Sequence, residues 1–175
     1  MDAWVGDTIF IKEDGAVQPT NAPIERNGNV YRFTRDVNST STRFGLYIMK
    51  NGITVDGAGH MISGVIGYGV YFLSGEDIKI RNLKVKGFSN GVGTPHGNRI
   101  EVSNCTFEKT RGPGVSLSGL SNSVVVGNVF INTGIDAQLS AGHGNIVRDN
   151  IVNVKRSSLY RMRRIRQLGG LNSAS

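Results

Sequence analysis

Five short segments of this chain repeat one pattern at intervals of 22 to 25 residues. Each alternates apolar and polar side chains over three positions and ends in a small or polar turn residue, which is typical of a short β-strand. A second short apolar stretch follows each segment, and a glycine-led third stretch follows in most repeats. One period therefore contains about three short strands joined by tight turns. The repeated segments are 51–57, 77–82, 98–104, 122–128 and 144–150.

This period predicts a solenoid in which each strand lies beside its counterpart one coil later, about 4.8 Å away. The gaps between strands are too short for the crossover helices of a doubly wound α/β fold. We therefore predict an all-β chain that forms a single-stranded parallel β-helix of about five coils, right-handed because parallel crossovers take that hand. The repeated corners explain why glycine makes up 24 of the 175 residues.

Asparagine ends four of the five segments. Asparagine tolerates the left-handed backbone of a tight corner, and stacked asparagine amides can hydrogen-bond from coil to coil. We therefore predict a structural ladder at one corner of the solenoid. Its members are Asn82, Asn104, Asn128 and Asn150.

The two ends of the chain depart from the period. Residues 1–44 contain strand-like stretches at 8–12 and 29–34 around a turn-rich segment, which predicts an N-terminal cap with an irregular first coil. Residues 45–154 form the coils. The pattern decays in the last of them, because Arg148 stands at a position expected to point inward. The corresponding residues of the earlier coils are Val55, Ile80, Val102 and Val126.

Residues 155–175 form a basic C-terminal tail. The tail holds six of the 20 Lys and Arg residues and no acid, so the formal net charge of +7 falls to +1 for the rest of the chain. Apolar residues at every third position of 159–168 favour a short amphipathic helix. The tail is interpreted as a helical cap, as a truncated coil with a disordered end, as a segment that contacts anionic surfaces or nucleic acid, or as a fragment boundary.

Charge, hydropathy and cysteine content limit the classes of partner. A nearly neutral body gives no reason to expect nucleic acid on the solenoid itself. No run of 18 apolar residues occurs, so no membrane span is predicted, and residues 1–10 do not resemble a signal peptide. The single cysteine, Cys105, allows neither an intrachain disulfide nor a zinc motif.

Two stretches resemble a known family. Residues 51–64, NGITVDGAGHMISG, resemble the start of the first coils of pectin-lyase-like right-handed β-helices, and the upstream stretch 9–36 is similar to the N-terminal part of secreted archaeal and bacterial members. The nearest subgroup comprises NosD-type domains and carbohydrate-binding and sugar-hydrolase domains, and the resemblance covers roughly residues 8–154. It implies an extracellular, cell-surface or periplasmic setting and a carbohydrate or cell-surface polysaccharide as partner. It is specific for fold rather than for activity.

The candidate substrate-binding residues are basic side chains that alternate away from the core. One interpretation is a basic patch for an acidic polysaccharide, with Arg81 or Lys84 accepting a proton from the carbon beside a uronate. The other is an ordinary solvated face, since Glu101 and Glu108 are expected beside two of the basic residues, one coil later. The four basic residues are Lys79, Arg81, Lys84 and Lys86.

Acids and histidines give little further chemistry. Glycoside hydrolysis needs two carboxylates about 5–9.5 Å apart, and the aspartates are scattered over different coils (Asp56, Asp77, Asp136 and Asp149). The histidines, at 60, 96 and 143, also lie in different coils, so no metal site is predicted. The triplet 142–144 is similar to the GHG motif of polygalacturonase-like hydrolases, but the partner motifs are absent. A weak calcium site at 76–77 would matter only in a lyase, and no other cofactor is expected.

The sequence thus favours a non-catalytic secreted or cell-surface module that binds carbohydrate or has a structural role. The alternative is a polysaccharide lyase or glycoside hydrolase, or a fragment of one, that acts on an acidic polysaccharide.

Overall fold

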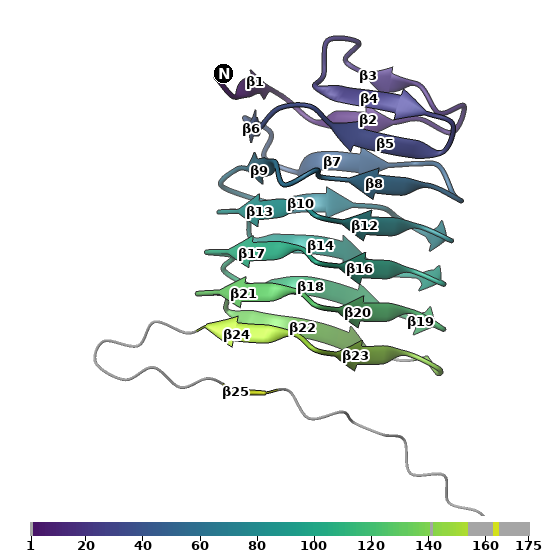
Figure 1. Ribbon diagram of the computed structural model, residues 1–175, viewed down its shortest axis with the longest axis vertical. Helices are drawn as coiled ribbons and strands as arrows, with labels where there is room; N and C mark the ends of the chain where they lie inside the picture. The colour runs from purple at the N-terminus through teal and green to yellow at the C-terminus, as the bar shows by residue number, and fades with distance from the viewer. Residues whose placement is uncertain (1, 141, 154–162, 165–175) are drawn as a thin grey trace, which may run out of the picture.

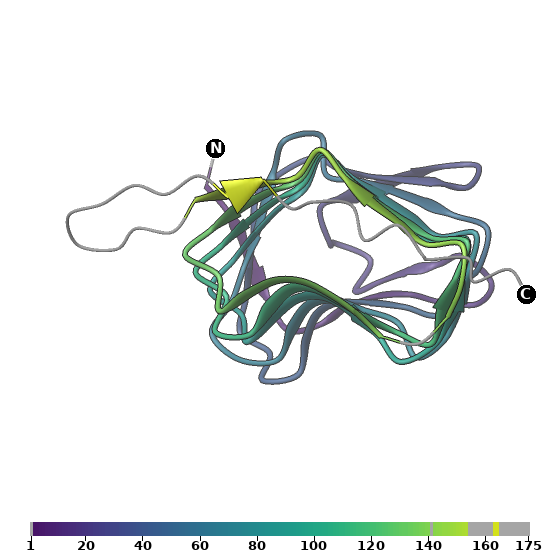
Figure 2. The same cartoon turned by 90° about the horizontal axis from the view of Figure 1, so that it is seen from below.

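The computed structural model is a parallel β-solenoid, and it describes residues 2–140, 142–153 and 163–164 (Figure 1). Every regular element in these residues is a strand, so no described helix is long and apolar enough to cross a membrane. Seen along the axis, successive coils superimpose around a common interior (Figure 2). The predicted all-β parallel solenoid is confirmed.

Each coil contributes one strand to each of three long sheets. Sheet A has the order β1 (Trp4–Gly6), β6 (Val37–Ser39), β9 (Met61–Ser63), β13 (Lys84–Lys86), β17 (Thr106–Glu108), β21 (Val129–Ile131), β24 (Ile151–Asn153) and β25 (Arg163–Arg164). Sheet B has the order β3 (Val17–Gln18), β2 (Ile9–Ile11), β7 (Phe44–Ile48), β10 (Tyr68–Tyr71), β14 (Asn90–Thr94), β18 (Pro113–Ser118) and β22 (Ile135–Ser140).

Sheet C has the order β4 (Ile24–Asn27), β5 (Val30–Phe33), β8 (Thr54–Asp56), β12 (Lys79–Arg81), β16 (Glu101–Ser103), β20 (Val124–Val126) and β23 (Ile146–Arg148). A small fourth sheet, D, lies at the corner between B and C and contains β11 (Gly75–Glu76), β15 (Gly97–Asn98) and β19 (Leu120–Ser121). Strands of successive coils pair in parallel throughout.

The N-terminal segment is both a coil and a cap. Strands β1, β2 and β5 pair in parallel with β6, β7 and β8, so residues before 44 already belong to the solenoid. Strands β3 and β4 pair antiparallel with β2 and β5 and lie at the N-terminal end of the stack (Figure 1). The buried Tyr31 hydroxyl donates to the Gly15 carbonyl at 2.9 Å and fixes the turn region against the first coil.

At the other end, the predicted amphipathic helix at 159–168 lies mostly outside the described residues. The described pair Arg163–Arg164 forms β25, a strand antiparallel to β24.

The interior consists of columns of apolar side chains, one from each strand. Branched aliphatic and aromatic residues stack on their counterparts, and Phe107 and Phe130 stack with their ring centroids 5.2 Å apart. One column per sheet illustrates the pattern: Ile62, Val85, Phe107 and Phe130 in A; Leu46, Val70, Val92 and Val115 in B; Val55, Ile80, Val102 and Val125 in C.

The asparagine ladder differs from its prediction. Asn128 and Asn150 are buried, and the Asn128 Nδ2 donates to Asn150 Oδ1 at 3.0 Å. Asn82 and Asn104 lie one position earlier, in the neighbouring column, at φ values of 54° and 52°. The ladder thus contains only two of the four predicted asparagines. The sequence pattern predicted that one residue forms both the left-handed corner and the stacked amide. In the structure the corner residue comes directly before the residue whose amide stacks.

The shift follows from the length of one coil compared with the spacing of the asparagines. Val85 pairs with Phe107 and Val92 pairs with Val115, so the turn from sheet A to sheet B is one residue longer in the later coil. The 24-residue spacing between Asn104 and Asn128 therefore crosses a coil of 23. For the same reason, the prediction that Arg148 points inward is wrong. Arg148 pairs with the outward Val126, and Val125 and Val147 are the inward pair.

The two columns should respond differently to mutation. Asn128 is fully buried, accepts from the Cys105 amide at 2.9 Å and donates to the Val102 carbonyl at 2.9 Å. Asn128→Ala leaves those groups without partners and should lower the free energy of unfolding by about 3 kcal/mol. Asn104→Gly at the exposed left-handed corner should change it by less than about 0.5 kcal/mol. Urea unfolding followed by circular dichroism measures both, and equal losses would contradict the assignment.

Candidate functional site

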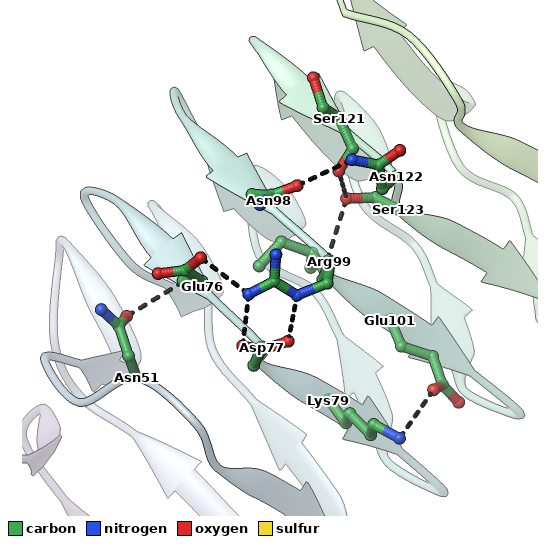
Figure 3. Close-up of polar contacts among 11 residues, drawn as sticks. Asn51, Glu76, Asp77, Lys79, Asn98, Arg99, Glu101, Ser121, Asn122 and Ser123 are labelled. Carbon is green, nitrogen blue, oxygen red and sulfur yellow. Dashed lines mark hydrogen bonds and ion pairs between the residues drawn. The ribbon is translucent and has the colours of Figure 1, made fainter.

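The four predicted basic residues lie on two different sheets. Lys79 and Arg81 are on β12 of sheet C, whereas Lys84 and Lys86 are on β13 of sheet A. The expected cross-coil pairs form: Lys79 Nζ lies 3.6 Å from Glu101 Oε2, as Figure 3 shows, and Lys86 Nζ lies 3.5 Å from a Glu108 oxygen. Arg81 Nη2 lies 3.2 Å from Asp56 Oδ2. Three of the four cations are thus paired with carboxylates.

Lys84, on the same strand and face as Lys86, lies near an Asp36–His60 contact. The His60 Nδ1 lies 3.2 Å from Asp36 Oδ1, which also accepts the Met61 amide at 2.9 Å. The Met61 amide, His60 and the Lys84 ammonium hold the pKa of Asp36 below its ordinary value, although partial burial opposes them. The Asp36–His60 contact brings one carboxylate near Lys84, which is not the pair of carboxylates that glycoside hydrolysis needs.

Asp56 is a buried carboxylate at the end of β8. Burial raises its pKa, but hydrogen bonds from the Ala58 amide and Asn82 Nδ2, at 2.9 and 3.1 Å, and the Arg81 guanidinium together bring it below its ordinary value. The Asp56 carboxylate accepts hydrogen bonds from the Ala58 amide and the Asn82 side chain, both at corners, and from Arg81. It therefore holds the turn after β8 in place. Arg81 is held by the same contacts.

The lowered pKa of Asp56 predicts a pH-dependent stability. A carboxyl group whose folded pKa is depressed stabilises the fold above its unfolded pKa, near 4, and this contribution is lost as pH falls through the folded value. Asp56→Asn should therefore be less stable than the parent at pH 7, with the difference shrinking as pH falls below about 4. Thermal unfolding across pH measures this, with Glu25→Gln on the exposed β4 as control. A difference that does not change with pH would contradict the assignment.

The acids expected as a weak calcium site are bound by an arginine instead (Figure 3). Arg99 Nε lies 2.6 Å from Asp77 Oδ1, and its Nη2 lies 2.7 Å from both Asp77 Oδ2 and Glu76 Oε1. Hydrogen bonding to this guanidinium lowers the pKa of Asp77. Among the described residues no three His, Cys, Asp or Glu side chains are grouped to hold a metal ion.

The histidines lie apart from one another, and the cysteine is buried. His60, His96 and His143 belong to three different turns, and the closest side-chain partner of His143 is the Ser121 hydroxyl at 3.5 Å. Cys105 is buried, and burial raises the pKa of its thiol to about 12, so it is protonated and unreactive at neutral pH.

The outer face of sheet B has a different character from those of A and C. Strands β2, β7, β10, β14 and β18 contain no Asp, Glu, Lys, Arg or His. Toward the N-terminal end of this face, aromatic side chains from three successive coils gather into one cluster. We call this cluster the aromatic face, and it consists of Phe10, Phe44, Tyr47, Tyr68 and Tyr71.

Register and ring stacking build the aromatic face. Phe10, Tyr47 and Tyr71 are direct neighbours on adjacent strands, as are Phe44 and Tyr68. Phe44 stacks on Tyr71 with centroids 4.7 Å apart, and Tyr47 stacks on Tyr71 at 5.8 Å. All five side chains are partly exposed. Each ring is held by at least one other, so the cluster is fixed before any ligand arrives.

The tyrosine hydroxyls of the aromatic face are available to a ligand. Those of Tyr47, Tyr68 and Tyr71 make no hydrogen bond within the described structure, and none is a buried polar atom without a partner. Partial burial raises the pKa of Tyr71, and the nearby Tyr68 and Tyr47 hydroxyls raise it further. Three hydroxyl groups, each able to donate and accept a hydrogen bond, thus belong to one cluster of stacked rings.

Sequence reasoning missed this face, although a signal for it exists. FGLY at 44–47 and YGVY at 68–71 are 24 residues apart and repeat one motif, an aromatic residue at both ends with glycine second. A Cβ on Gly45 or Gly69 would lie within 2.7 Å of a core side chain, Ile62 or Val85. In each motif the glycine and the residue after it face the core. The aromatic residues at the first and fourth positions therefore point outward.

Comparison with known proteins supports the fold. A family model described as a right-handed beta helix region matches residues 6–160. No curated protein and no solved structure matches the chain.

Proposed function

Because the chain belongs to the right-handed β-helix family, we propose that it is a non-catalytic carbohydrate-binding module whose ligand is an uncharged glycan on the aromatic face. The observation that carries the proposal is the contrast between sheets. Sheets A and C present charges that are largely paired, whereas five strands of sheet B present none and bear the aromatic cluster. The extracellular or cell-surface setting implied by the fold resemblance would place such a module where glycans occur.

The chemistry of the face suits a sugar. A pyranose ring has an apolar C–H face that packs against aromatic rings and a rim of hydroxyl groups that hydrogen-bond to polar atoms. The aromatic face offers both, since its rings are partly exposed and its three tyrosine hydroxyls lack protein partners. Rigid stacking lowers the ordering cost of binding.

The strands of this face contain no acid or base, and the nearby Lys12 ammonium lies over the Phe10 ring, 4.9 Å from its centroid. Lyase and hydrolase mechanisms need a general acid or base beside the reacting bond, and no carboxylate, histidine or lysine occurs on β2, β7, β10, β14 or β18. The acidic and basic residues of the other faces are engaged mostly with one another. This supports binding without turnover.

Binding assays test the proposal. The protein should bind soluble neutral oligosaccharides, measured by calorimetry against a panel of neutral sugars and against polygalacturonate and alginate. Tyr71→Ala removes the ring that stacks on both Phe44 and Tyr47, and it should weaken binding at least about tenfold, a loss of about 1.4 kcal/mol.

The matched control is Lys84→Ala on sheet A, which should leave neutral-sugar binding unchanged. Binding restricted to polyuronates and lost in Lys84→Ala, or release of an unsaturated product from a polyuronate, would overturn the proposal. So would the absence of binding to every neutral glycan of the panel.

A further inference from the structure

We propose that the glycan carries N-acetyl groups and that Asn90 reads them, an inference that rests on the aromatic face being the glycan-binding surface. Asn90 begins β14 and is the direct neighbour of Tyr68 on β10. It continues the column that Phe44 and Tyr68 begin, so the aromatic face ends in a side-chain amide.

The Asn90 amide is available. Its backbone N–H donates to the carbonyl of Gly67, the residue directly before β10, at 2.9 Å, and this bond holds Asn90 against the preceding coil. Its side chain hydrogen-bonds to no described residue, although the asparagines of the interior ladder are fully engaged. The carboxamide therefore presents one acceptor oxygen and two donor hydrogens beside the Tyr68 ring.

Two glycines leave room around this corner of the face. A Cβ on Gly93, in the same strand as Asn90, would lie 2.3 Å from the Tyr68 ring, so the ring lies directly on the backbone of β14. A Cβ on Gly112, in the next coil, would lie 2.8 Å from Asn90 Oδ1. Neither glycine has a positive φ, so the conformation does not require glycine at either position. Glycine is required at these positions because a larger side chain would collide with the Tyr68 ring or the Asn90 amide.

Aliphatic side chains border the aromatic face on both sides. Met49 and Leu73 occupy equivalent positions two residues after Tyr47 and Tyr71 and are 41% and 60% exposed. Ile66, two residues before Tyr68, is 47% exposed. Such a border gives a hydroxyl-only sugar little to bind, but it provides apolar contact for methyl groups.

An acetamido substituent matches this arrangement group by group. It has one N–H, one C=O and one methyl group, and a side-chain amide can accept from the first and donate to the second. The methyl group can pack on Ile66 or on the Tyr68 ring. No cation or anion lies on these strands, so the match is to an uncharged N-acetylated sugar rather than to an amine or a uronate.

Paired oligosaccharides test the inference directly. Chitohexaose and cellohexaose share their β-1,4 backbone and differ in the acetamido group at C2. The protein should bind chitohexaose about tenfold more tightly, by calorimetry. Asn90→Ala should reduce that ratio to about one, because chitohexaose binding weakens about tenfold. Asn98→Ala at the sheet D corner, outside this surface, should keep the parent ratio.

Each outcome bears on one claim. Equal affinity for the two hexasaccharides, or preference for cellohexaose, would refute the N-acetyl inference and leave the neutral-glycan function standing. A preference for chitohexaose that survives in Asn90→Ala would refute the role of Asn90. Binding to neither, with no other neutral glycan bound, would refute the proposed function itself. Circular dichroism spectra matching the parent would show that the variants are folded.

Discussion

The hydrogen bonds between successive coils are the constraint from which the rest of the structure follows. Because each strand pairs in parallel with its counterpart, each residue lies beside the equivalent residue of the next coil. Equivalent side chains therefore stack into columns that run along the solenoid axis. Inside, this requires apolar residues that tolerate stacking. At corners it requires left-handed residues, several in each coil, and these are supplied by Gly, Asn, Asp and even Arg99 and Lys109.

Outside, the same stacking determines what each face can do. A basic residue finds an acid in the next coil, as with Lys79 and Glu101, so sheets A and C become networks of paired charges. On sheet B the columns hold aromatic rings instead, and the rings support one another as the core side chains do. The solenoid therefore builds a rigid aromatic surface on strands that contain no charged residue.

The period was enough to predict the fold from the sequence, since strand spacing and short turns leave few alternatives. It also predicted the Lys79–Glu101 and Lys86–Glu108 pairs. It failed in the coil from Val102 to Val125, which is 23 residues long, because Asn104 and Asn128 are 24 residues apart and aligning them puts the later coil one residue out of register. That single shift misassigned Asn82, Asn104 and Arg148. The strands of the aromatic face contain no acid, base or metal ligand that would mark them as a candidate site in the sequence. The aromatic motif at 44–47 and 68–71 departs from strict alternation, so its outward direction emerges only with the glycine packing.

The most direct test of the central claim, that the aromatic face binds the glycan, is nuclear magnetic resonance of ring-labelled tyrosine. The resonances of Tyr47, Tyr68 and Tyr71 should shift on titration with a bound neutral oligosaccharide, whereas those of Tyr31, buried under the N-terminal turn, should not. Saturable binding that leaves all three face tyrosines unchanged would contradict the account.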